Sequence, residues 1–335
     1  MFKYIVKRLL ISLLVLFGVS VIIYGLVRMM PNDYIDIKFA PQIAQGTISP
    51  EDLQHFKDLY GIGDNSFMGL VSGYCNWLGN FLRGDLGVSF KYEKPVAEVI
   101  TNNMWISFAI AIVATILQFA IAIPLGISSA THQYSVRDYT VTVLTMIGIS
   151  LPSYFFAAIL IKIFSVDLGW LPSNGLVDAG AVYLPTFAGR MAELGDMAKH
   201  LVLPITVSVV LSLGGLMRYT RTNTLEVLNA DYIRTARAKG LTERTVIYKH
   251  AFRNTMIPLV TLLAGILPSL FGGMMITEEV FAIDGIGRLA YKALTEGDIP
   301  FIMGYNMFLA VLTVIGTLFS DIMYSVVDPR VKLGK

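Results

Sequence analysis

The sequence LLISLLVLFGVSVIIYGLV, residues 9–27, is a run of 19 residues without a charged side chain. A helix rises about 1.5 Å per residue, so about 20 apolar residues span the hydrocarbon core of a bilayer. Lys3, Lys7 and Arg8 precede the run, as in a signal peptide, but the run is longer than the apolar core of such a peptide. The sequence that follows, Arg28-Met29-Met30-Pro31, offers no small-residue cleavage site. We therefore expect an uncleaved membrane helix here.

Further uncharged runs of similar length follow along the chain. The chain of 335 residues is 55% hydrophobic and 15% charged, where soluble domains have about 25% charged residues. Strands of a membrane barrel would alternate over about ten residues, and these runs do not. We expect an all-α polytopic membrane protein with six transmembrane helices. The five further runs are residues 99–136, 139–161, 200–217, 254–277 and 299–320.

The distribution of basic residues predicts the orientation of the chain. With both termini inside, the inner segments hold 15 Lys and Arg in 62 residues, and the rest of the chain holds 11. The positive-inside rule therefore favours cytoplasmic termini and a multi-pass protein of the cytoplasmic membrane, surrounded by lipid. The inner segments are residues 1–8, 129–138, 218–253 and 328–335.

The division of the chain follows from these spans. Residues 1–28 form the first membrane helix, 29–98 an outer insertion, 99–327 a core of five helices, and 328–335 a tail. In the insertion, Ser49-Pro50-Glu51-Asp52 has the features of a helix start. Residues 67–82 carry apolar side chains at helical spacing, which suits either a helix at the membrane interface or one packed on the outer ends of the bundle. The single cysteine, Cys75, excludes an internal disulfide.

Several kinds of chemistry have no motif in the sequence. No phosphate-binding G-x-x-x-x-G-K-[ST] loop and no H-E-x-x-H pair occur, and the four histidines are scattered. We therefore expect no catalytic residues, no metal site and no cofactor in this chain.

The distribution of charge also limits the possible functions. The net charge of +2, without a stripe of basic and aromatic residues, argues against nucleic-acid binding. The six runs hold no acidic residue, which disfavours a proton-coupled carrier. We expect Asp321, just after the last run, to pair with a basic residue.

The long inner segment 218–253 is the strongest candidate for function. It starts with a helical pattern, breaks at Gly240 and resumes toward Phe252. Small residues, among them Ala230, Ala236 and Gly240, would let a partner approach closely, and Tyr232 is of a type enriched at interfaces. An ordinary loop on lipid headgroups is the alternative. The basic residues around this patch are Arg234, Arg237, Lys239, Arg244, Lys249 and Arg253.

Residues 231–241, DYIRTARAKGL, resemble the coupling loop of ABC importer permeases in the form typical of the dipeptide and oligopeptide branch. The family's first Glu in this loop is Arg234 here, and its later Ile-x-Leu-Pro is replaced by residues 250–254, HAFRN; both changes are usual in that branch. The resemblance spans the chain and is of the B type. Its further motifs are MPND at 30–33, GDLGVS at 84–89, GISLPS at 148–153, LGWLP at 168–172 and EVF followed by GIGR at 279–288.

The resemblance implies a type I ABC importer permease fold in a prokaryotic cytoplasmic membrane. It implies a second homologous permease, two cytoplasmic ATPases that bind ATP and Mg²⁺, and an outer substrate-binding protein. The implied cargo is peptides, and permeases of this type also import nickel chelates, glutathione or sugars; an ion-coupled carrier and a membrane scaffold are further alternatives. The expected ATPase contacts are Ala230, Asp231, Tyr232, Arg234, Ala236, Arg237 and Gly240. The expected contacts of the outer protein are Glu278, Glu279 and Asp284.

Overall fold

The computed structural model describes residues 2–30, 34–46, 49, 66–260 and 262–327, and these residues are mainly helical. The expected helix start at 49–52 and the tail 328–335 lie outside the described residues, apart from Ser49. The first half contains α1 (Phe2–Arg28), α2 (Tyr34–Ala44), α4 (Phe67–Leu82), α5 (Val96–Thr131), α6 (Val136–Ser150) and α7 (Ser153–Leu160). The second half contains α8 (Phe187–Leu228), α9 (Asp231–Ala238), α10 (Glu243–Thr245), α11 (Phe252–Val260), α12 (Leu263–Phe271), α13 (Met275–Val280), α14 (Ile286–Thr295) and α15 (Ile299–Val327).

Four helices of the described chain, α1, α5, α8 and α15, are long and apolar enough to cross a membrane. A fifth crossing is available if α6 and the helix after it, which meet at a bend of 104°, count as one span. The bend falls at Leu151 and Pro152, both in extended conformation. Proline disfavours helical geometry in the residue before it, so the expected helix 139–161 is broken there.

The expected span 254–277 is also interrupted. It is divided among α11, α12 and α13, with Pro258 inside α11 and Pro268 inside α12. A proline in a helix removes one backbone hydrogen bond and crowds the preceding turn. Gly273, with φ of +71°, follows α12 in a conformation that favours glycine. The runs 139–161 and 254–277 are therefore helical but interrupted, at or near prolines.

Small residues let the long helices pack closely. A Cβ added at Gly126 of α5 would lie 2.8 Å from the carbonyl oxygen of Met217 in α8. Likewise, a Cβ at Gly148 of α6 would lie 2.8 Å from the Val210 oxygen of α8. In lipid the hydrophobic effect does not drive helices together, so van der Waals contacts at such close approach stabilise their association. Helix α8 therefore lies against both α5 and α6.

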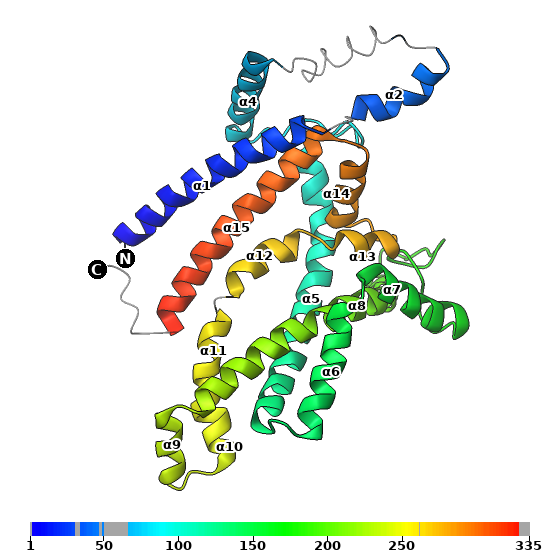
Figure 1. Ribbon diagram of the computed structural model, residues 1–335. Coiled ribbons are helices and arrows are strands. Elements are labelled where there is room, and N and C mark those ends of the chain that lie inside the picture. Colours follow the sequence, from blue (N-terminus) through cyan, green and yellow to red (C-terminus); the bar gives the residue numbers. More distant parts are fainter. Residues whose placement is uncertain (1, 31–33, 47–48, 50–65, 261, 328–335) are drawn as a thin grey trace.

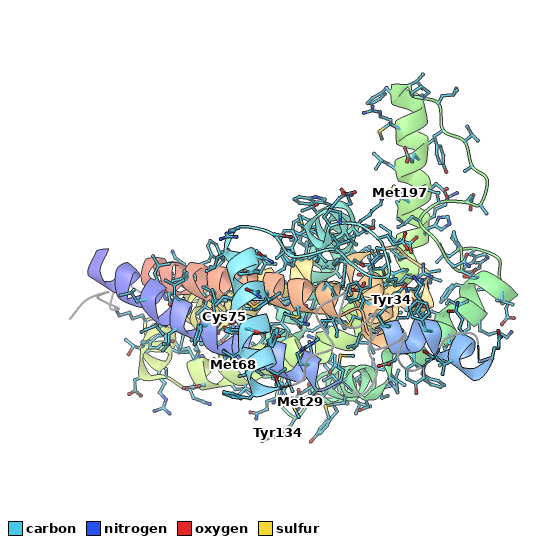
Figure 2. All side chains as sticks on the ribbon, turned by 90° about the horizontal axis from the view of Figure 1, so that it is seen from above. Met29, Tyr34, Met68, Cys75, Tyr134 and Met197 are labelled. Carbon is cyan, nitrogen blue, oxygen red and sulfur yellow. The ribbon has the colours of Figure 1, made fainter. Side chains whose placement is uncertain are left out.

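Helix α4 packs on α1 at the end of the bundle near α2. The Tyr74 hydroxyl lies 2.7 Å from Ser20 Oγ, and the Tyr74 ring meets Tyr24 edge-on at 5.5 Å. Cys75 and Met68 mark this helix in Figure 2. Of the two alternatives for 67–82, the structure favours packing on the bundle, although Phe67 and Met68 remain exposed.

Different helices lie at the two ends of the molecule. Figure 1 shows α9 and α10 at one end, while α2, α4 and α14 lie at the opposite end. Arg8 near the N-terminus pairs with Asp321 of α15, with Nε and Oδ2 3.3 Å apart, which confirms the expected partner of Asp321. The helices α1 and α15 that carry this pair run side by side in Figure 1.

Candidate functional site

The segment 229–251 forms a compact lobe, here called the coupling lobe, at the end of α8. Helix α8 ends at Leu228, α9 follows at once, and a turn at Gly240 leads to α10. Gly240 has φ of +76°, a left-handed conformation that residues with a Cβ disfavour. A π-helical turn, Val246–Ala251, then leads into α11. This confirms the predicted pattern of helix, glycine and helix.

A small apolar core holds the coupling lobe together. Ile233 and Ala236 of α9 are buried against Val246 and Ala251 of the π-helical turn. Val227 and Leu228, at the end of α8, pack against the same cluster. This core therefore joins α9 and the π-helical turn to the end of α8.

The outer surface of α9 is polar and carries one large aromatic side chain. Tyr232 is 45% exposed, and Arg234, with Asp231 beside it, is exposed on the same helix. Arg237 Nε bonds to Glu243 Oε1 of α10 at 2.8 Å, which ties the two helices of the lobe. Asp231 in the first turn and Arg237 in the last turn both suit the helix dipole.

The structure separates the predicted contact residues into two groups. Asp231, Tyr232, Arg234, Arg237 and Gly240 are exposed and available to a partner. Ala230 precedes α9 and is half-buried. Ala236 is buried in the lobe core, so the prediction that it leaves room for a partner is wrong. Its small size instead lets α9 approach the π-helical turn.

An ion pair above the coupling lobe had no signal in the sequence. Asp138 of α6 accepts two hydrogen bonds from the Arg221 guanidinium of α8 and one from Ser129 Oγ of α5 at 2.6 Å. The Tyr134 backbone N–H donates to the same carboxylate at 3.0 Å. These bonds join three helices at the end of the bundle that carries the lobe. Asp138 and Arg221 are 83 residues apart in the sequence, so their spacing alone does not predict that they pair.

A cavity of about 370 Å³ opens between the central helices. Beside this cavity, the side-chain amide of Gln118 in α5 donates to the backbone oxygen of Ser212 in α8 at 3.0 Å. The Tyr219 hydroxyl donates to the Pro258 carbonyl oxygen at 3.4 Å, so one of the interrupted helices is held against α8 here. Proline breaks can line a solute path in this way. The lining residues are Gln118, Phe119, Ser212, Gly215, Leu216, Tyr219, Leu262 and Ile266.

On α13, Glu278 is fully buried, with 0% of the residue exposed. Ser107 Oγ donates to its Oε1 at 2.7 Å, and the backbone N–H groups of Met274 and Arg288 donate at 2.9 Å each. A buried carboxylate with three donors is an internal anchor. The prediction that Glu278 contacts an outer protein is therefore wrong.

Glu279 and Asp284 remain accessible. Both carboxylates bind the Arg288 guanidinium, Glu279 at 3.0 Å and Asp284 at 2.7 Å. Asp284 is the more exposed of the two. A partner would meet this ion-paired cluster on α13 and α14, and the predicted contact at these two residues stays a prediction.

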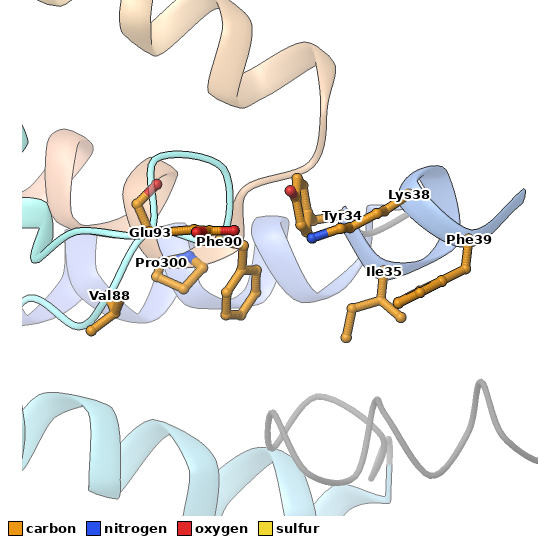
Figure 3. Close-up of a pocket in the computed structure, with 9 residues that line it drawn as sticks. Tyr34, Ile35, Lys38, Phe39, Val88, Phe90, Glu93 and Pro300 are labelled. Atoms are coloured by element: carbon orange, nitrogen blue, oxygen red, sulfur yellow. The ribbon is translucent and has the colours of Figure 1, made fainter.

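A second cavity, of about 490 Å³, lies under α2 (Figure 3). One side is formed by α2, and the other by the loop after α4 together with Pro300. The lining residues are Tyr34, Ile35, Lys38, Phe39, Val88, Ser89, Phe90, Glu93 and Pro300. Asp298 fixes this loop, because its Oδ2 accepts from Ser89 Oγ at 2.5 Å and from the Lys91 N–H at 3.1 Å. The cavity therefore separates α2 from a loop anchored on the start of α15.

The bundle, the coupling lobe and the central cavity define a class: a helical membrane component of a transport system. The chain belongs to the family described as binding-protein-dependent transport system inner membrane component, whose pattern matches residues 122–333. Such a chain is a multi-pass inner-membrane pore subunit.

Named relatives match nearly the whole chain. It is 36% identical over 333 residues to the oligopeptide transport system permease protein AppB of Bacillus subtilis, covering 99% of this chain and 100% of the relative. It is 31% identical over 341 residues to the dipeptide transport system permease protein DppB of Alkalihalophilus pseudofirmus, covering 99% and 100%. The likeness to dipeptide and oligopeptide permeases of ABC importers, noted in the sequence, is confirmed.

A solved structure shares the fold. The chain resembles a chain of the MetNI methionine ABC transporter in inward-facing conformations, with a TM-score of 0.50 and 18% identity. The match covers 69% of this chain and 97% of the other. The predicted ABC importer permease fold is confirmed on this ground.

Proposed function

We propose that this chain is a permease subunit of an ATP-driven importer of dipeptides or oligopeptides. The observation that carries the proposal is the coupling lobe, which exposes Tyr232 and charged residues on a helix whose core is continuous with α8. The whole-length similarity to relatives named as peptide permeases supports peptides as the cargo. Nickel chelates, glutathione, sugars and other small solutes are the alternative cargo.

In this proposal two cytoplasmic ATPases bind ATP and Mg²⁺, and each docks on the α9 of one permease. A second homologous permease completes the pore, and an outer binding protein delivers the solute. Closure of the ATPases would shift the permease pair between two states, because ATP favours the state in which the docked interface is closed. The lobe core would pass this shift to α8 and so to the central cavity.

A substitution at Gly240 tests the docking assignment. Gly240→Val forces a β-branched residue into φ of +76°, which costs about 1–2 kcal/mol and displaces α10 from α9. A Cβ there meets nothing within 4 Å, so the effect is on the backbone alone. Gly240→Asn is the matched control, because Asn tolerates this conformation. We expect Gly240→Val alone to lose ATPase copurification and uptake; normal values for both would refute the docking role.

The cargo is tested by purifying the importer with its binding protein and identifying the bound ligand by mass spectrometry. We expect peptides, and competition by unlabelled dipeptides or oligopeptides for uptake. A binding protein that carries a nickel chelate, glutathione or a sugar would overturn the peptide assignment and leave the permease assignment intact. Uptake by the purified chain alone, driven by an ion gradient, would overturn the permease assignment as well.

We propose that both termini lie in the cytoplasm. Cys75, the only cysteine, is exposed on α4, at the end of the bundle opposite the coupling lobe. A membrane-impermeant maleimide should label Cys75 in intact spheroplasts. The matched control carries Cys75→Ser with Arg244→Cys in the lobe and should be labelled only after permeabilisation. The reverse pattern would invert the orientation.

A further inference from the structure

A histidine and two aspartates converge where the segment after α7 meets the start of α8. Asp178 lies in this segment, and Asp196 and His200 lie one turn apart on α8. Each offers one ligand atom, and the three atoms lie within 4.8 Å of one another. Figure 2 shows this part of α8, marked by Met197, standing out from the rest of the bundle with the preceding segment beside it. The cluster has no part in the coupling lobe or the central cavity.

The surroundings of His200 determine which ring nitrogen carries the proton. Its side chain is only 2% exposed. Nδ1 lies 3.0 Å from the backbone oxygen of Asp196 and 3.3 Å from Asp196 Oδ1. Both neighbours are acceptors, which favours the tautomer with the hydrogen on Nδ1 and the lone pair on Nε2.

Nε2 then faces a second acceptor. Asp178 Oδ1 lies 3.8 Å away, and the described part of the chain provides no hydrogen-bond donor to Nε2. A lone pair on a buried ring beside a carboxylate is unfavourable unless a cation lies between them. The space between His200 and Asp178 therefore suits a positive ion.

Asp196 holds the other two groups in place. Its Oδ2 accepts from the backbone N–H of Asp178 at 2.7 Å and from the Tyr183 hydroxyl. Histidines that bind metals commonly donate their second N–H to a carboxylate or a backbone oxygen, which fixes the ring. His200 has both on Asp196.

We propose that Asp178, Asp196 and His200 bind a divalent transition-metal cation of the Zn²⁺ type. One imidazole and two carboxylates match the ligand preference of such ions, and the two negative charges balance the ion. With bonds of about 2.0–2.2 Å in tetrahedral geometry, two ligand atoms on one ion lie about 3.4 Å apart. The cluster must therefore contract by up to about 1.4 Å from its widest separation. Asp178, whose side chain is 75% exposed, can make this movement.

The bound cation would fasten the segment that carries Asp178 to α8. The same helix continues from His200 to Leu228, about 42 Å at 1.5 Å per residue, and ends in the coupling lobe. Because the ion binds the folded chain, its presence raises the stability of the protein by mass action. Thermal stability is thus a readout that does not depend on transport.

The test titrates Zn²⁺ into the full chain, in its complex and stripped of metals, against a chromophoric chelator. We expect one Zn²⁺ per chain, a rise in unfolding temperature with Zn²⁺, and no such rise with Mg²⁺, for which imidazole is a poor ligand. Asp178→Asn keeps the backbone N–H to Asp196 and should weaken Zn²⁺ binding at least about tenfold. Glu193→Gln, an exposed acid on the same helix, is the matched control and should bind like wild type.

A second variant distinguishes metal binding from a purely structural role of Asp178. His200→Gln should lose the Zn²⁺ response of the unfolding temperature, and Co²⁺ bound to wild type should show ligand-field absorption that this variant lacks. Equal Zn²⁺ affinity for Asp178→Asn and Glu193→Gln would overturn the proposal. So would the absence of Zn²⁺ binding to wild type, which would mean that a proton on Nε2 bridges His200 and Asp178 instead.

Discussion

Arg221 of α8 and Asp138 of α6 form an ion pair through two parallel hydrogen bonds, Nε to Oδ1 at 2.8 Å and Nη2 to Oδ2 at 2.7 Å. The Asp138 side chain is 4% exposed, so this pair is largely removed from water. Ser129 of α5 donates to the same carboxylate. Rotation of α8 against α5 and α6 would break these charged hydrogen bonds, so the pair holds the end of α8 that carries the coupling lobe against the bundle.

Breaking this pair should destabilise the protein. Asp138→Ala leaves the Arg221 guanidinium partly buried without its partner, which we expect to lower the free energy of unfolding by about 3 kcal/mol. The double variant Asp138→Ala, Arg221→Met should recover part of this loss, because no unpaired charge remains. Chemical unfolding in detergent measures both. The control is Arg137→Gln, at the exposed residue that precedes Asp138. An equal loss in that variant would contradict this role for the pair.

Tyr232 and Ile233 are neighbours on α9 with opposite surroundings, and their substitution should separate docking from folding. Tyr232→Ala removes an exposed side chain, so we expect unchanged thermal unfolding and loss of ATPase copurification. Ile233→Ala opens the lobe core and should cost about 2–4 kcal/mol, seen as faster hydrogen exchange across the lobe. Thr235→Ala, exposed on the same helix, is the control for Tyr232. A Tyr232→Ala protein that copurifies with ATPase at the wild-type level would refute the contact.

The sequence predicted those features that depend on local composition. Uncharged runs located α1, α5, α8 and α15, and the left-handed turn at Gly240 followed from a glycine between two helical patterns. Pro152 and Pro258 also lie in the two runs that the structure divides, because proline disfavours a continuous helix. The anchors at Asp138 and Glu278 were missed because their partners lie 83 and 171 residues away. Pairings of that kind are set by helix packing.

Gly214 and Gly215 are adjacent on α8 and should respond differently to a side chain. A Cβ at Gly214 would lie 2.4 Å from Ile149 Cδ1 and 2.6 Å from the Thr145 oxygen of α6. Gly214→Ala should therefore force α6 and α8 apart and cost about 1–3 kcal/mol. Gly215→Ala meets nothing within 4 Å and should be neutral or stabilising by up to about 1 kcal/mol. Thermal unfolding compares them, and equal stability of the two variants would contradict the close packing of α6 on α8.

Gly215 also lines the central cavity, so a larger residue there tests whether the solute passes through it. Gly215→Leu should fill part of the cavity of about 370 Å³ and slow uptake. Because no atom lies near the added Cβ, we expect thermal stability close to that of Gly215→Ala. Initial uptake rates at saturating solute, corrected for the amount of complex, measure the effect. Uptake by Gly215→Leu at the rate of Gly215→Ala would place the path elsewhere.

Glu278 should matter far more for stability than Glu279, its neighbour on α13. Glu278→Ala leaves the Ser107 hydroxyl and the N–H groups of Met274 and Arg288 without their acceptor. A buried unsatisfied group costs about 1–3 kcal/mol, so we expect a total loss of at least about 3 kcal/mol. Glu279→Gln weakens one contact of Arg288, which keeps Asp284, and should cost less than about 1 kcal/mol. Hydrogen exchange at the Met274 and Arg288 amides should accelerate in Glu278→Ala alone, because Glu278 accepts from these two groups and Glu279 does not. Protection of both amides in Glu278→Ala would show that the turn between α12 and α14 is held by other contacts.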